Sequence, residues 1–155
     1  MSKFKVHIEQ LDPMRVVVFR GYSKTPEMEA HEHAVAFAKE KGLIDEHNRL
    51  KTFGFNKPAP WATKGEQYGY ELWVVVDSDV DVPPYLMVKE FPGVKCAVTS
   101  IEKLADIGAA WEYLYEWVEN SEDYEHAHMD GLEEVLSPLG TPEEELAFNL
   151  YLPVS

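Results

Sequence analysis

The sequence predicts an α+β fold built from two similar strand-strand-helix-strand-strand modules. Shifted by eighty residues, the chain aligns with itself: segment 11–18 falls on segment 91–98 without a gap, and the turn residues, a basic residue and an apolar run match in kind. At the same offset Phe37 falls on Trp117, inside two expected helices. Self-similarity at a long period is the mark of a repeated supersecondary unit. Two such units joined face to face leave a seam, and small ligands tend to bind at such seams.

The first module begins with two strands. Residues 5–11 alternate in polarity, which indicates a half-buried strand. Asp12-Pro13 is typical of a turn, and residues 15–20 form a β-branched second strand.

A helix follows, with signals at both ends. Thr25 offers a capping hydroxyl, Pro26 suits the first helical position and Glu27 places an acid in the first turn. The helix is predicted to run to about Lys41, and Gly42 ends it.

The first module closes with two strands and a connector. Strands are expected at 51–55 and 68–76, separated by a loop at 56–64 that is rich in Pro and Lys. Residues 78–84 belong to a polar, Pro-containing connector and mark the boundary between halves.

The second module repeats this order. Strands are expected at 86–91 and 94–100 around Pro92-Gly93, and a helix at 107–120, where Trp111 and Leu114 belong to one apolar stripe. Further strands are expected at 132–136 and 146–152. The chain is therefore predicted to be one domain, 1–155, made of half-repeats 1–77 and 85–155 joined by 78–84.

Composition excludes several classes of protein. Hydrophobic residues make up 45% of the 155 residues, enough for a packed interior. The net charge of −14 argues against nucleic-acid binding, which needs a basic surface, and suits a cationic ligand. No apolar run is long enough to cross a bilayer and the single Cys96 cannot form an internal disulfide, so a cytoplasmic protein without membrane contact is expected.

The histidines look at first like metal ligands. His31 and His33 lie two residues apart in the expected helix and do not share a face. His126 and His128 would share a face in an extended segment, but no further His or Cys completes a tetrahedral set. No metal and no cofactor are therefore expected.

Aromatic residues, 12% of the chain, suggest a π-lined pocket as the alternative to plain core packing. The strand 68–76 is apolar on both faces, so one face can meet a helix and the other must be covered by the second half or by a ligand. Glu71 lies on that second face beside Trp73. An acid there is either at a solvated strand end or functional.

Four strings carry a resemblance to a known family. They are Phe53-Gly54-Phe55-Asn56-Lys57-Pro58-Ala59-Pro60, Tyr68-Gly69-Tyr70-Glu71-Leu72-Trp73, Leu132-Glu133-Glu134 and Leu150-Tyr151-Leu152-Pro153-Val154. In this order and spacing, along with the repeat, the chain resembles the GyrI-like small-molecule-binding family, which also forms the effector-binding domain of AraC- and MerR-type multidrug regulators.

The resemblance implies a pseudo-twofold fold of two α/β modules, with a ligand groove at their junction that accepts lipophilic, often cationic aromatic compounds. It also implies an acid, in the strand before the last one, that projects into this aromatic groove. That acid falls on Glu133, with Glu134 as the alternative if the register differs by one, and the polar residue common two positions on is Val135 here. The candidate aromatic walls are Tyr68, Tyr70, Trp73, Trp111 and Tyr151.

Three functions are compatible with these features. The first is a stand-alone module that binds lipophilic cations, in a regulatory or drug-sequestering role. The second is a hydrolase of reactive drug-like compounds, with Glu133 or Glu71 as general base on water. The third is an acidic inhibitor that meets a basic protein partner.

Overall fold

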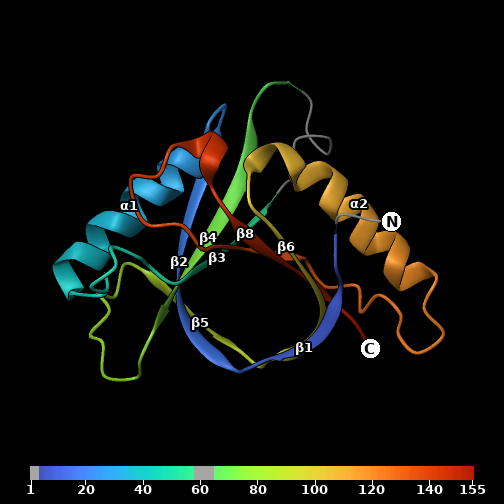
Figure 1. The fold of residues 1–155 in the computed structure, drawn as a ribbon. Coiled ribbons are helices and arrows are strands. Elements are labelled where there is room, and N and C mark those ends of the chain that lie inside the picture. The colour runs from blue at the N-terminus through green and yellow to red at the C-terminus, as the bar shows by residue number, and fades with distance from the viewer. Residues whose placement is uncertain (1–3, 58–64) are drawn as a thin grey trace. The chain divides into compact units, whose positions relative to one another are not determined.

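Each helix and strand expected from the sequence is present in the computed structural model, which describes residues 4–57 and 65–155 (Figure 1). The α+β class is confirmed. Most of the expected loop 56–64 lies outside the described residues. The chain divides into two compact units.

Residues Met14–Phe91 form one unit. Its elements are β2 (Met14–Ser23), α1 (Pro26–Lys41), β3 (Thr52–Asn56), β4 (Tyr68–Val76) and β5 (Met87–Phe91). The strands lie in the order β3-β4-β2-β5 and every adjacent pair is antiparallel.

Residues Met1–Pro13 and Pro92–Ser155 form the other unit. Its elements are β1 (His7–Leu11), β6 (Val94–Ile101), η2 (Leu104–Asp106), α2 (Ile107–Glu119), β7 (Leu132–Val135), η3 (Glu143–Glu145) and β8 (Phe148–Pro153). The strand order β1-β6-β8-β7 is again antiparallel throughout. The short 3₁₀ turns η2 and η3 were not anticipated, and η3 delays the last strand, which starts at Phe148 and not at 146.

The two units do not coincide with the half-repeats 1–77 and 85–155. β1 pairs with β6, where His7 lies opposite Val98, and β5 pairs with β2, where Met14 lies opposite Phe91. The turns at Asp12-Pro13 and Pro92-Gly93 therefore lead the chain from one unit to the other and do not close hairpins. The two crossing points occupy equivalent places in the eighty-residue repeat, so each half gives its first strand to the unit of the other half.

Helix α1 packs on one face of β2 and β4. Phe37 contacts Phe19 of β2 with ring centroids 5.6 Å apart, and the small side chains of Ala30, Ala34 and Ala38 are fully buried. Leu72 of β4 lies directly opposite Phe19, so it shares the face covered by α1.

The ends of α1 match the sequence signals only in part. Gly42 adopts a left-handed conformation with φ 67° and ends the helix as expected. The expected cap at Thr25 is wrong, because its hydroxyl makes no capping hydrogen bond. The backbone N–H of Thr25 instead donates to Ser23 Oγ at 3.0 Å, which draws Thr25 into the preceding turn.

Helix α2 covers one face of β6 and β8. Leu114 is completely buried against an apolar cluster that includes Leu150 and Leu152 of β8. On the opposite side of the helix Glu112 and Glu116 are exposed, which fits an amphipathic helix on a sheet.

A methyl group at Gly21 of β2 is expected to destabilise the protein. A Cβ there would lie 2.3 Å from the backbone oxygen of Pro26, and backbone cannot rotate aside. We expect Gly21→Ala to lower the free energy of unfolding by about 1–3 kcal/mol in urea denaturation. Gly108→Ala in α2, where no atom lies within 4 Å of the added Cβ, should instead stabilise by up to about 1 kcal/mol. Equal effects of the two substitutions would contradict this account.

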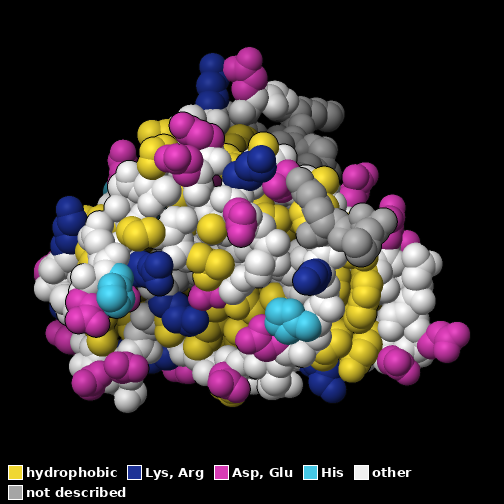
Figure 2. Space-filling model, viewed as in Figure 1, with side chains coloured by type: hydrophobic (Ala, Val, Ile, Leu, Met, Phe, Trp, Pro, Cys, Tyr) yellow, Lys and Arg dark blue, Asp and Glu magenta, His cyan; other side chains and the backbone are white. Residues whose placement is uncertain are grey.

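Figure 2 shows one face of the molecule, on which acidic side chains are widely spread. Lys and Arg side chains lie between them, singly or in small groups. None of the helices in the described part of the chain is long and apolar enough to cross a membrane.

Candidate functional site

Strand β7 presents two adjacent glutamates to opposite faces of its sheet. Glu133 lies opposite Leu150 of β8, and Glu134 lies opposite Asn149. Leu150 belongs to the apolar cluster under α2. Because side chains alternate along a strand, Glu133 shares the face covered by α2, and Glu134 lies on the other face.

Glu134 is a buried carboxylate that accepts hydrogen bonds from β8. Only 8% of the residue is exposed. The Tyr151 hydroxyl donates to Glu134 Oε1 at 2.7 Å, and the Asn149 side-chain amide donates to the same oxygen at 3.4 Å. Asn149 is itself oriented by Ser100, whose hydroxyl donates to Asn149 Oδ1 at 2.5 Å. The carboxylate is thus held in a defined direction on the face away from α2.

The Tyr151 hydroxyl remains a proton donor at neutral pH. Burial raises the pKa of Tyr151 well above its usual range, and the hydrogen bond to Glu134 with the charge of that carboxylate raises it further. The hydrogen bond from this phenol fixes the position of the neighbouring carboxylate.

Glu133 and Trp111, two of the predicted site residues, do meet, but on the helix side of the sheet. The indole Nε1–H of Trp111 in α2 donates to Glu133 Oε2 at 3.2 Å. A Cβ at Gly131 would lie 2.7 Å from the Trp111 ring, so glycine lets this indole lie close to the backbone before β7. The pair therefore links α2 to β7.

Glu71 is the second buried carboxylate, on the face of β4 away from α1. It is fully buried, so the interpretation as a solvated strand end is wrong. Arg20 Nε donates to Oε1 at 2.9 Å, while Trp73 Nε1 and Lys89 Nζ donate to Oε2 at 2.6 and 3.0 Å. Donors from the three neighbouring strands β2, β4 and β5 thus occupy both oxygens of the Glu71 carboxylate.

These contacts decide the protonation of Glu71. Burial by itself would raise the pKa of Glu71, but the hydrogen bonds from Trp73, Lys89 and Arg20 outweigh burial and hold it below its ordinary value. A carboxylate with a low pKa and two occupied oxygens is a weak general base.

Trp73 is the centre of an aromatic group in the same unit. Phe55 of β3 meets it edge-on at 5.4 Å between ring centroids, and Phe91 of β5 lies at 5.6 Å. Lys89 Nζ lies 5.8 Å from the Trp73 ring centroid, within cation–π range.

Tyr68 and Tyr70, also predicted as walls, lie apart from this group. The Tyr68 hydroxyl donates to the Glu27 carboxylate at the start of α1, at 2.8 and 2.9 Å to its two oxygens. Tyr70 shares the α1 side of β4 with Leu72 and fills the space over Gly54, where a Cβ would clash with the Tyr70 ring.

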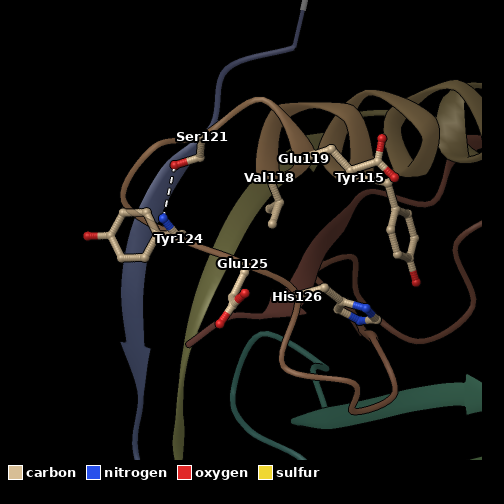
Figure 3. A pocket seen from close by; sticks show the side chains of 7 residues that line it. All are labelled: Tyr115, Val118, Glu119, Ser121, Tyr124, Glu125 and His126. Atoms are coloured by element: carbon tan, nitrogen blue, oxygen red, sulfur yellow. Dashed lines mark hydrogen bonds between the residues drawn. The ribbon is translucent and has the colours of Figure 1, made fainter.

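A cavity of about 260 Å³ lies beside the C-terminal end of α2 (Figure 3). Its walls are Tyr115, Val118, Glu119, Ser121, Tyr124, Glu125 and His126. The His126 ring meets Tyr115 edge-on at 5.5 Å and lies 5.2 Å from His128. The His126 and His128 rings come together although His128 lies in a bend with φ 57° and not in an extended segment. The described residues include no group of three or more His, Cys, Asp or Glu arranged for a metal ion.

The sequence matches a family model over residues 7–154, described as Cass2, integron-associated effector-binding protein. The chain belongs to this family. The match agrees with the resemblance to GyrI-like effector-binding domains. No curated protein matches the sequence.

Solved structures share the fold of this Cass2-family chain. The EcmrR C-terminal domain is 11% identical, with a TM-score of 0.67 over 99% of each chain. A hydrolase from Listeria innocua is 15% identical, with a TM-score of 0.66 over 97% of this chain and 92% of that one. SAV2435 bound to tetraphenylphosphonium is 14% identical, with a TM-score of 0.60 over 97% and 94% of the two chains. The chain spans 57% of the EcmrR chain in its DNA complex.

Several polar residues of the Cass2-family chain were not anticipated as site residues. Arg20, Lys89 and Asn149 are separated from their acids by 15 to 51 positions, so spacing alone gives no signal for them. The eighty-residue offset places Phe53 on Glu133. The pattern Tyr70-Glu71-Leu72-Trp73 matches Phe148-Asn149-Leu150-Tyr151 at an offset of 78. Because Phe55 pairs with Glu71 and Glu134 pairs with Asn149, the strand pairing makes Phe55 the counterpart of Glu134.

Proposed function

We propose that this chain binds lipophilic aromatic cations and that Glu134 of β7 supplies the anionic group. Family membership supports small-molecule effector binding. The observation that carries the finer proposal is the buried Glu134 carboxylate, oriented by the Tyr151 hydroxyl at 2.7 Å. The anionic role is thereby assigned to Glu134, the alternative candidate from the sequence, and not to Glu133.

Burial makes the Glu134 carboxylate selective for positive charge. Removing an ionised carboxylate from water is costly, and a cation at close range offsets that cost more strongly there than at the surface. Glu71 is completely buried and is already bound by Arg20 and Lys89, so it is poorly suited to a cationic ligand.

Tyr151 is 4% exposed and its hydroxyl contacts Glu134, so a cation that reaches this acid would also come within cation–π range of the Tyr151 ring. SAV2435, which has a similar fold, was solved with tetraphenylphosphonium, itself a lipophilic aromatic cation. Stacking tolerates varied ring shapes while the acid selects charge, a combination that favours several ligands over one. Such a module would serve as a regulator's effector sensor or as a drug-sequestering protein.

The hydrolase alternative now depends on Glu133, because the lowered pKa of Glu71 makes that residue a weak base. Mass spectrometry after incubation with electrophilic drug-like compounds separates the two functions, since turnover changes the compound and binding does not.

Isothermal titration with tetraphenylphosphonium and with neutral triphenylphosphine oxide tests the binding proposal. We expect the cation to bind at least ten-fold more tightly than the neutral compound. Glu134→Gln should weaken cation binding by about 10- to 100-fold, the range for loss of a charge contact of about 1.4–3 kcal/mol.

Glu133→Gln is the matched control, because it removes the same charge from the same strand on the opposite face. It should leave the affinity within about two-fold, because its charge faces α2. Loss of binding in Glu133→Gln but not in Glu134→Gln would assign the acid to Glu133. Unchanged binding in both variants would overturn the proposal.

A further inference from the structure

Arg20 and Lys89 form a locally positive group in a strongly acidic chain. Both bind the single carboxylate of Glu71, at 2.9 and 3.0 Å, so two positive charges face one negative charge. The Arg20 side chain is 52% exposed and that of Lys89 is 34% exposed, whereas that of Glu71 is 1% exposed. The excess positive charge is therefore presented to solvent.

Arg20 and Lys89 each have more N–H donors than their hydrogen bonds to described residues use. A guanidinium carries five N–H donors, and the contacts of Arg20 with described residues are the bond from Nε to Glu71 and a 3.9 Å approach of Nη2 to the Met87 sulfur. Lys89 has three N–H donors, and its hydrogen bond within the described part of the chain is the one to Glu71. The Nη1 edge of Arg20 and two protons of Lys89 are available to an incoming acceptor.

The buried side chains of Trp73 and Glu71 hold Arg20 and Lys89 in place. Trp73 is 8% exposed, donates to Glu71 at 2.6 Å and lies under Lys89. Because Glu71 binds Arg20 through Oε1 and Lys89 through Oε2, one rigid acid fixes both cations. Pre-positioned donors lose less side-chain entropy when a ligand arrives.

Apolar side chains flank Arg20 on the same face. Met87 is 45% exposed and touches the guanidinium through sulfur, while Tyr22, two residues along β2, is 57% exposed. A flexible thioether and a phenol ring are suitable contacts for an aromatic ring.

We propose that Arg20 and Lys89 form a binding site for the carboxylate of an aromatic acid, with Met87 and Tyr22 contacting its ring. The planar guanidinium matches the two oxygens of a carboxylate, and the lysine adds a point charge. This site lies within the unit Met14–Phe91 and does not depend on the proposal for Glu134. It extends the ligand range of the protein from cations to anionic aromatic compounds.

Titration with 2-naphthoate, compared with neutral 2-naphthamide, tests this site. We expect 2-naphthoate to bind in the millimolar range or tighter and 2-naphthamide to bind at least ten-fold more weakly. Arg20→Gln and Lys89→Gln should each weaken 2-naphthoate binding about ten-fold, as loss of one charged hydrogen bond does.

Glu71→Gln provides the sharper test, because it should strengthen 2-naphthoate binding several-fold. Glutamine still accepts a hydrogen bond from Trp73, but it no longer competes for the charge of Arg20 and Lys89. A purely structural role for these residues predicts the opposite, since the variant would only loosen the site. Lys24→Gln, which removes an exposed cation paired with Glu66 in the same unit, is the matched control and should change nothing.

Each variant is checked by its thermal unfolding before titration, and if one cationic variant fails to fold, the other one and Glu71→Gln still decide the outcome. No binding of 2-naphthoate to the unmodified protein at millimolar concentration would overturn the proposal, and so would unchanged or weaker binding in Glu71→Gln. Glu134→Gln should leave 2-naphthoate binding intact. Titrations with tetraphenylphosphonium and with 2-naphthoate therefore test the cation proposal and this proposal independently.

Discussion

Glu71→Ala is expected to lower the free energy of unfolding by about 1–3 kcal/mol, the cost of leaving a buried hydrogen-bond donor without its acceptor. Glu71 is fully buried and receives hydrogen bonds from Arg20, Trp73 and Lys89. Truncation leaves the buried indole N–H of Trp73 without its acceptor and leaves two cations facing each other. Guanidinium denaturation monitored by circular dichroism measures the loss.

Glu71→Gln is the matched control for charge, since it retains shape and an acceptor for Trp73. We expect it to lose less than half as much stability as Glu71→Ala. Equal stability of Glu71→Ala and the unmodified protein would show that the buried contacts contribute nothing net.

The pH dependence of stability follows from the same contacts. The folded pKa of Glu71 is depressed below its unfolded value of about 4.3. Its contribution is therefore fully present above the unfolded pKa and is lost as the pH falls through the folded pKa. The stability difference between the unmodified protein and Glu71→Gln should shrink in that acidic range and stay constant at neutral pH.

Trp73→Ala is expected to cost about 3–5 kcal/mol, as removal of a large buried aromatic side chain does. Trp73 is 8% exposed and packs against Phe55 and Phe91. The variant loses these ring contacts, opens a cavity and also removes a hydrogen bond to Glu71. Urea denaturation of Trp73→Ala and of Trp73→Phe separates packing from the hydrogen bond, because phenylalanine restores much of the volume but has no N–H.

Trp73 and Glu71 should not contribute independently. Their side chains share a 2.6 Å hydrogen bond, so the cost of changing both should be less than the sum of the single costs. An additive double variant would mean that the hydrogen bond carries no coupling energy.

The secondary structure of this chain could be predicted from sequence patterns that extend over only a few residues. The apolar segment 68–76 was predicted as the strand β4, the alternate direction of side chains along it placed Glu71 with Trp73 on one face, and Gly42 marked the end of α1. These features depend on residues within a few positions of each other, where side-chain periodicity and backbone preference act directly. The cap predicted at Thr25 does not form: the Thr25 hydroxyl makes no capping hydrogen bond, and its backbone N–H donates to Ser23, two residues earlier.

Glu133 and Glu134 illustrate what the sequence left open. Adjacent residues in a strand must face opposite ways, so the sequence could state that only one enters a given pocket. Which one faces α2 depends on the pairing of β7 with β8, where Glu133 meets Leu150 and Glu134 meets Asn149. A shift of one residue in that register would exchange their roles.

The sequence by itself determined the repeat, the order of elements and the acid beside Trp73. Only the tertiary structure decided that β1 and β5 join the unit of the other half, and that Arg20 and Lys89 converge on Glu71. The physical reason is that strand pairing and ion pairing join residues far apart in the chain. Such contacts form only when the whole sheet does, and no local spacing encodes them.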